Sequence, residues 1–195
     1  MLIGLTGMSG AGKSTVAALL EKKGFRIIDC DALVHALYED IRYIRLIRDA
    51  FGEEYVCGTA VDRKKLGALV FSDAQALRKL NDTVSPFIMR AVTERIEEAK
   101  AGDVSAVLDA PLLFEYGLES YCDSVIGVTA DLETAVSRLC ARDSRTEEEI
   151  RARLRSQHGA SFFRERCDYV LENNGSEETL SASLNDILEK MYIYR

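Results

Sequence analysis

Apolar residues along this chain occur in two kinds of run, which predict two kinds of element. Spacings of three and four predict amphipathic helices, as in Leu33, Leu37, Ile41, Ile44 and Ile47. Short continuous apolar runs predict strands buried on both faces, at residues 1–6, 25–28, 105–109, 124–129 and 169–172. Because helical stretches separate these runs, we expect an α/β fold with a five-stranded parallel sheet and helices on both faces.

The first predicted strand leads into a glycine-rich loop, Gly7 to Thr15, that fits the P-loop pattern. A helical pattern follows and ends before Gly24. A loop between a strand and a helix points the first backbone N–H groups of the helix at an anion. The expected nucleotide-binding residues are Gly10, Ala11, Gly12, Lys13, Ser14 and Thr15. The alternative is a glycine-rich turn that binds nothing.

Three side chains in this pattern suit phosphate and metal chemistry. Lys13 can reach the β- and γ-phosphates, and the Ser14 hydroxyl can take a Mg²⁺ position. Asp109 closes a hydrophobic run, as does the acid that holds Mg²⁺ or its waters in P-loop proteins. The alternative for Asp109 is a cap or turn role before Pro111.

Two more acids, Asp29 and Asp31, follow the second predicted strand. Open α/β sheets bind their ligands at the carboxyl ends of their strands. A carboxylate there can accept a proton from an attacking hydroxyl. Asp is also common as a helix cap, and the residues alone leave the two interpretations open.

A long helical stretch, from residue 32 to about residue 100, separates the second and third predicted strands. It contains predicted helices at residues 63–71, 73–80 and 86–100, with Pro86 near the start of the last. One crossover between strands needs far fewer residues. We therefore expect an inserted helical lobe for a second substrate.

An arginine-rich region late in the chain is interpreted as a mobile lid. Thr146 and Glu149 match a capping box, and at least one of Arg138, Arg142 and Arg153 is expected to contact phosphate. The alternative is an exposed helix with Glu–Arg pairs. The expected parts are a nucleotide-binding core (residues 1–31, 104–140 and 168–195), a substrate lobe (32–103) and the lid (141–167).

Composition excludes some classes of protein. A net charge of −7 argues against a general nucleic-acid binder, which needs a basic surface. The five cysteines are scattered, with no Cys-x-x-Cys pair, which indicates reduced thiols. No run is apolar enough to span a membrane, and Met1 leads directly into the first strand. We expect a cytoplasmic protein, either a monomer or a small homo-oligomer.

Several stretches, in order along nearly the whole chain, resemble one family, the dephospho-CoA kinases. Ile-Asp-Cys-Asp at residues 28–31 resembles the family's Ile-Asp-Ala-Asp. Pro-Leu-Leu-Phe-Glu at residues 111–115 resembles its Pro-Leu-Leu-Phe-Glu. Three further parts of the family pattern have counterparts here. The family's substrate lobe is resembled by Phe51-Gly52, Asp62-Arg63, Leu66 and Val70-Phe71. Its lid is resembled by Arg142-Asp143 and residues 153–157, and its late Asn-Asn-Gly turn by residues 173–175.

The resemblance implies ATP-dependent phosphorylation of the 3′-hydroxyl of dephospho-CoA, which yields coenzyme A and ADP. It implies Asp31 as the base, Lys13 as the phosphate clamp and Arg142 on the transferring phosphate. It also implies that Ser14 and Asp109 serve Mg²⁺. The region of Asn173 and Asn174 is expected to lie toward the adenine.

Three positions depart from the family pattern. Ser85 stands where the family often has His, Phe163 where it has Lys or Arg, and Cys30 where it has Ala. Two alternative functions remain: a P-loop kinase of a nucleoside or nucleoside monophosphate, and a nucleotide-gated switch such as a GTPase. The chain lacks the Asn-Lys-x-Asp guanine motif and the Asp-x-x-Gly switch that a GTPase would carry.

Overall fold

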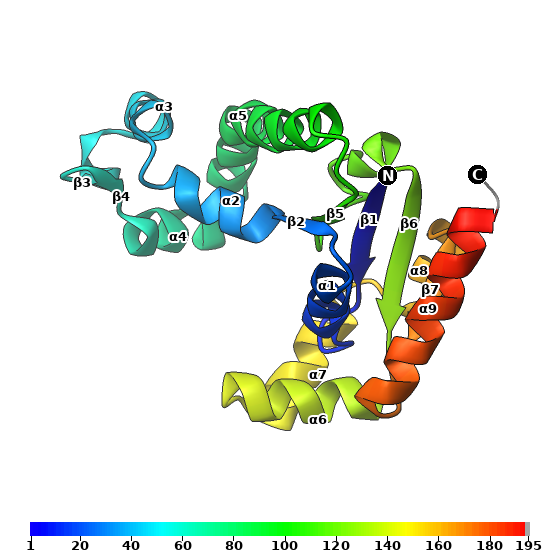
Figure 1. Ribbon diagram of the computed structural model, residues 1–195. Helices are drawn as coiled ribbons and strands as arrows, with labels where there is room; N and C mark the ends of the chain where they lie inside the picture. The colour runs from blue at the N-terminus through cyan, green and yellow to red at the C-terminus, as the bar shows by residue number, and fades with distance from the viewer. Residues whose placement is uncertain (194–195) are drawn as a thin grey trace. The chain divides into compact units, whose positions relative to one another are not determined.

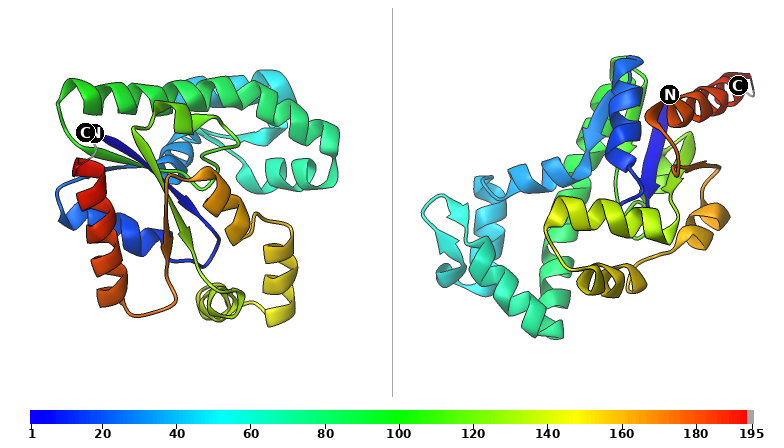
Figure 2. Two further views of the ribbon diagram at one scale, coloured as in Figure 1. Left: turned by 90° about the vertical axis from the view of Figure 1, so that its right-hand side faces the viewer. Right: turned by 90° about the horizontal axis from the view of Figure 1, so that it is seen from below.

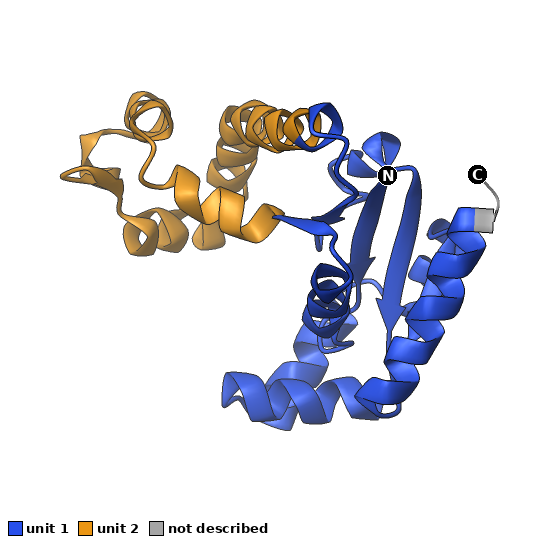
Figure 3. Ribbon diagram, in the orientation of Figure 1, with its two compact units in different colours: residues 1–28, 99–195 blue, residues 29–98 orange. Residues whose placement is uncertain are grey.

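The computed structural model describes residues 1–193, and the chain divides into two compact units (Figure 3). Unit 1 combines residues 1–28 with the chain from residue 99 onward, and unit 2 comprises residues 29–98. Unit 2 contains most of the stretch in which the sequence predicts an inserted helical lobe. The described helices include none that is long and apolar enough to cross a membrane.

Unit 1 is built on a five-stranded sheet of order β2-β5-β1-β6-β7 (Figure 1). Its strands are β1 (Leu2–Gly7), β2 (Arg26–Asp29), β5 (Ala106–Asp109), β6 (Ser124–Thr129) and β7 (Tyr169–Glu172). The pairs β1–β5, β1–β6 and β6–β7 are parallel. The predicted sheet is therefore confirmed, and the carboxyl end of its central strand β1 leads into the glycine-rich loop.

Helices cover both faces of this sheet. They are α1 (Lys13–Lys22), α6 (Leu132–Asp143), α7 (Glu147–Arg155), α8 (Ala160–Arg166) and α9 (Glu177–Ile193), with a 3₁₀ turn η2 (Leu118–Tyr121). On one face, Leu5 and Ile126 form a core with Leu20 of α1 and Leu184 of α9, all fully buried. On the other face, α8 brings Phe163 against Gly127 of β6, and Figure 2 shows α8 and α9 on opposite sides of the sheet. Each buried Leu or Ile contributes about 1.5–3 kcal/mol.

Local sequence signals explain several helix boundaries in unit 1. The capping box at Thr146 is confirmed, because its side chain accepts from the Glu149 N–H while Glu149 accepts from the Thr146 N–H. Asp131 occupies the N-cap position of α6, but its side chain makes no capping hydrogen bond. Helix α8 has no side-chain cap and was not predicted.

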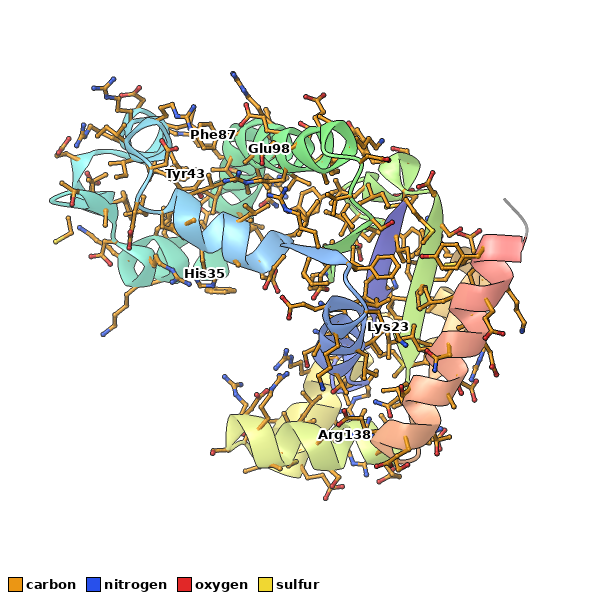
Figure 4. The ribbon with its side chains drawn as sticks, in the orientation of Figure 1. Lys23, His35, Tyr43, Phe87, Glu98 and Arg138 are labelled. Carbon is orange, nitrogen blue, oxygen red and sulfur yellow. The ribbon has the colours of Figure 1, made fainter. Side chains whose placement is uncertain are left out.

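Unit 2 has its own core. Its elements are α2 (Cys30–Leu37), α3 (Ile41–Phe51), η1 (Glu53–Tyr55), β3 (Val56–Cys57), β4 (Ala60–Val61), α4 (Arg63–Ser72) and α5 (Ala74–Ala101), the last of which runs on into unit 1. The core centres on Tyr43, Ile44 and Ile47 of α3. The rings of Tyr43 and Phe87, both labelled in Figure 4, have centroids 5.8 Å apart.

One set of predicted helix boundaries in this region is wrong. The helices predicted at residues 73–80 and 86–100 are a single helix, α5, so Pro86 lies inside a helix and not near a helix start. Proline removes one hydrogen bond from a helix, but Val84 and Phe87 on either side of it pack into the unit 2 core, which offsets the loss. The apolar spacing from Leu33 to Ile47 covers two helices, because Asp40 breaks the run and caps α3 by accepting from the Arg42 N–H.

The cysteines differ widely in exposure, which predicts their reactivity. None of the five cysteines, all of which the structure describes, is in a disulfide, and Cys57 is exposed. Burial raises the pKa of the Cys122 and Cys167 thiols to about 12, so at pH 8 almost none of either is thiolate. Iodoacetamide at pH 8 should modify Cys57 on the order of 10²-fold faster than these two. Peptide mass spectrometry over time checks this order, and rapid labelling of Cys167 in the folded protein would contradict it.

Candidate active site

The loop between β1 and α1 is curled by its glycines. Gly10 has φ +78° and Gly12 φ +90°, values that favour glycine. A Cβ atom on Gly10 would also lie 2.8 Å from the Ala135 carbonyl oxygen of α6. Within the loop, the Ala11 N–H donates to the Met8 carbonyl at 3.1 Å. The strand–loop–helix arrangement that the sequence predicts is therefore present.

An ion pair joins the end of this loop to the end of the neighbouring strand. The Lys13 ammonium, in the first turn of α1, donates to the carboxylate of Asp109 at the end of β5. Asp109 is buried, with 8% of its surface exposed, whereas Ser14 beside Lys13 is exposed. The fold thus brings together two of the predicted residues, the Lys13 ammonium and the Asp109 carboxylate, at the carboxyl edge of the sheet, and Ser14 follows Lys13 in the first turn of α1.

The loop after β7 contacts the same region. The Asn173 side chain is buried and donates from Nδ2 to the Ala11 carbonyl at 2.8 Å. The Asn174 Oδ1 atom accepts from the Asp131 N–H at 2.8 Å. Arg138, labelled on α6 in Figure 4, donates from Nη1 to the Asn173 carbonyl at 3.0 Å. Sequence reasoning placed both asparagines toward a nucleobase and missed the contact between Asn173 and the glycine-rich loop.

The other two arginines of the predicted trio share one acid. Arg142 and Arg153 bind the Asp143 carboxylate, with the shortest distances 2.6 Å and 3.0 Å. The hydrogen bond to Asp143 raises the pKa of Arg142, and the same bond lowers the pKa of the Asp143 carboxyl. Among the three, the contact with the glycine-rich loop comes from Arg138, whose Nη1 atom lies 3.5 Å from the Ala11 carbonyl.

The alternative interpretation of this region, exposed Glu–Arg pairs, holds at one place. Arg151 binds Glu147 at 2.7 Å and Glu133 at 2.6 Å. Glu149 and Arg153 also have the four-residue spacing of such a pair but do not bind each other, because Glu149 takes part in the capping box and Arg153 binds Asp143.

A cluster of rings joins α8 to the turn after β5. His158 stacks on Phe162 with centroids 3.7 Å apart, and its Nε2 atom lies 3.3 Å from Glu115. The Phe114 ring meets Phe162 edge-on, and the Arg166 guanidinium lies over both rings. Periodicity gave no signal for this cluster, because α8 spans only two turns and its partners are about 45 residues earlier in the chain.

The two acids after β2 behave differently. Asp29 is the N-cap of α2, and its side chain accepts from the Ala32 N–H at 2.9 Å. Asp31 is exposed in the first turn of the same helix. The structure therefore assigns the capping role to Asp29, while the proposed role of Asp31 as a base stays a prediction. Asp31 belongs to unit 2 and the glycine-rich loop to unit 1.

A parallel sheet whose central strand opens into a lysine-bearing glycine loop, with an aspartate ending the neighbouring strand, defines the class of P-loop nucleotide-binding folds. The solved structure of shikimate kinase from Acinetobacter baumannii shares this fold, with a TM-score of 0.55 and 18% identity over 100% of this chain and 94% of that one. The family model described as dephospho-CoA kinase matches residues 1–179. The chain therefore belongs to the dephospho-CoA kinase family.

Individual relatives agree with this assignment. A protein of Latilactobacillus sakei named dephospho-CoA kinase is 37% identical over 189 residues, covering 96% of this chain and 94% of the relative. The crystal structure of TT1252 from Thermus thermophilus is 38% identical and has a TM-score of 0.78, with 97% of each chain covered. The similarity thus extends over both units.

Proposed function

We propose that this chain transfers the γ-phosphoryl group of ATP to the 3′-hydroxyl of dephospho-CoA and releases coenzyme A and ADP. The observation that carries this proposal is the family match over residues 1–179, which includes the loop with Lys13 and the strand end with Asp109. The alternative acceptors, nucleosides and nucleoside monophosphates, are not favoured, because the similar proteins named above share the whole chain and not only the P-loop.

In the proposed reaction, the acceptor 3′-oxygen attacks the γ-phosphorus of ATP. The bond from that phosphorus to the β–γ bridging oxygen breaks, and ADP leaves with the electron pair. Lys13 and the loop amides hold the phosphates, and Arg142 neutralises charge on the transferring group. Asp31 accepts the proton of the 3′-hydroxyl. Most of the rate enhancement then comes from positioning and charge neutralisation.

The donor set at this edge of the sheet suits Mg²⁺. Its oxygen atoms belong to the Ser14 hydroxyl and the Asp109 carboxylate, and oxygen ligands are those that Mg²⁺ takes. Within residues 1–193 no group of three or more His, Cys, Asp or Glu side chains forms a metal site. When bound, Mg²⁺ would complete its ligands with nucleotide phosphates and water, and it would neutralise the phosphate charge there.

The remaining assignments are part of the same proposal. Residues 32–103 would hold dephospho-CoA, residues 141–167 would close as a lid, and Asn174 would border the adenine. The core at residues 1–31, 104–140 and 168–195 would hold ATP. Five cysteines without a disulfide among them fit a reducing compartment such as the cytoplasm, where we propose the protein acts as a monomer or small homo-oligomer.

A panel of acceptors tests the proposal. ADP release is followed with ATP, Mg²⁺ and one of dephospho-CoA, adenosine, a nucleoside monophosphate or no acceptor. We expect turnover with dephospho-CoA to exceed every other rate by on the order of 10²-fold or more, the scale of discrimination by hydrogen-bonding sites. Coenzyme A is the matched control, because its 3′-oxygen is already phosphorylated and should support no ADP release. Preferred turnover of a nucleoside monophosphate, or GTP hydrolysis without an acceptor, would refute it.

A further inference from the structure

Asn173, in the turn after β7, is fixed by hydrogen bonds at three of its polar groups. Its backbone N–H donates to the Thr129 carbonyl at 2.8 Å, and its carbonyl accepts from Arg138 at 3.0 Å. Its side-chain amide donates to the Ala11 carbonyl at 2.8 Å, and the residue is only 6% exposed. Because a carbonyl can only accept, the Nδ2 atom and not Oδ1 must face Ala11, which fixes the side-chain orientation.

The acceptor of this bond lies in the middle of the glycine-rich loop. Ala11 is fully buried, and its carbonyl belongs to the peptide unit that it shares with Gly12. The described backbone contains no cis peptide, and in a trans peptide the C=O and N–H groups point in opposite directions. Holding the Ala11 carbonyl toward Asn173 therefore turns the Gly12 N–H away from Asn173.

The fit between Asn173 and the loop is close. A Cβ atom on Gly12 would overlap the Nδ2 atom of Asn173, and Gly12 has φ +90°. Arg138 adds a second donor on the same side, because its Nη1 atom lies 3.5 Å from the Ala11 carbonyl and 3.0 Å from the Asn173 carbonyl. The carbonyl side of this peptide is thus held by two residues from outside the loop, and its N–H points to the opposite side.

We propose that Asn173 is a positioning residue for the phosphates of ATP: by holding the Ala11 carbonyl, it aims the Gly12 N–H at them. The proposal rests on the proposed use of this loop for ATP. It replaces a direct role of the Asn173 side chain at the nucleobase, because its amide is already bonded to the loop. The effect of Asn173 should therefore depend on the phosphates of the ligand and not on its adenosine part.

Two variants with two ligands test this dependence. In Asn173→Ala the donor is lost, and we expect the dissociation constant for ATP to rise about tenfold, the scale of one hydrogen bond. In Asn173→Asp a carboxylate faces the Ala11 carbonyl with no proton to share, and the rise should be larger. The dissociation constant for adenosine should stay within about twofold of wild type in both variants. Calorimetry measures ATP with Mg²⁺, and an NMR titration measures adenosine.

Glu172→Gln is the matched control, because Glu172 is the neighbouring residue and pairs at the surface with Arg164. It should bind both ligands as wild type does. Equal losses of ATP and adenosine affinity in Asn173→Ala would overturn the proposal, because they would place the side chain at the nucleobase. Unchanged ATP affinity would overturn it as well.

The test does not depend on which acceptor the enzyme uses. Binding of ATP and adenosine is measured without dephospho-CoA. The result can therefore be interpreted even if dephospho-CoA proves not to be the acceptor. Circular dichroism establishes that each variant is folded at the temperature used. If Asn173→Asp does not fold, Asn173→Ala decides alone, since its smaller side chain adds no charge next to Ala11.

Discussion

Replacing Lys13 with alanine should reduce turnover with ATP and dephospho-CoA by on the order of 10²-fold or more. The ammonium is proposed to clamp the β- and γ-phosphates, where negative charge develops during transfer. Steady-state kinetics with both substrates varied gives kcat and KM separately. The exposed Lys22, on the last turn of the same helix, provides the control variant Lys22→Ala, which should behave as wild type.

The same substitution should also change stability. Asp109 is buried and loses the cation that it binds, which lowers the free energy of unfolding by about 1–3 kcal/mol. Urea unfolding with and without nucleotide separates this effect from catalysis. Turnover of Lys13→Ala within a few-fold of wild type would contradict the proposed clamp, whatever its stability.

The second large effect is expected at Asp31. Asp31→Asn keeps the size of the side chain but cannot take a proton, so kcat should fall on the order of 10²-fold or more, the scale of a general base. The affinity for ATP should change little, because the carboxylate is proposed to act on the acceptor. Single-turnover kinetics at saturating concentrations of both substrates measures the chemical step directly.

Asp29 offers a matched control two residues earlier. Asp29→Asn should keep both activity and stability, because asparagine caps a helix about as well as aspartate and can still accept from the Ala32 N–H. If Asp31→Asn turned over normally while Asp29→Asn did not, the assignment of the two acids would have to be reversed.

The sheet could be predicted from sequence because its strands are buried on both faces. In a strand such as β6, Val125 to Val128 are all buried and all lack polar side chains, and such a run is visible in the sequence. The caps at Thr146 and Asp29 could also be predicted, because a side chain and the N–H that it binds lie three residues apart. The P-loop could be predicted because its residues are consecutive in the sequence and follow a fixed spacing.

Contacts between distant segments could not be predicted. Asn173 and Ala11 are 162 positions apart, and neither residue type signals the other. The partners of Arg142 and Arg153 depend on how α6 and α7 meet at Asp143, which no pattern along either helix states. The prediction for Pro86 was wrong because the hydrogen bond that proline removes from a helix can be read from the sequence. The burial of Val84 and Phe87, which offsets this loss, cannot.

The strand order has a consequence for how the protein is made. Strand β1 is synthesised before both of its neighbours, because Leu2 pairs with Ala106 and Ile3 with Ser124. It must therefore wait until β5 or β6 has been synthesised before it can pair, and such non-local pairing is slow. Residues 29–98 form a compact and largely helical unit, and helices depend mainly on local contacts, so we expect this unit to fold first, during synthesis.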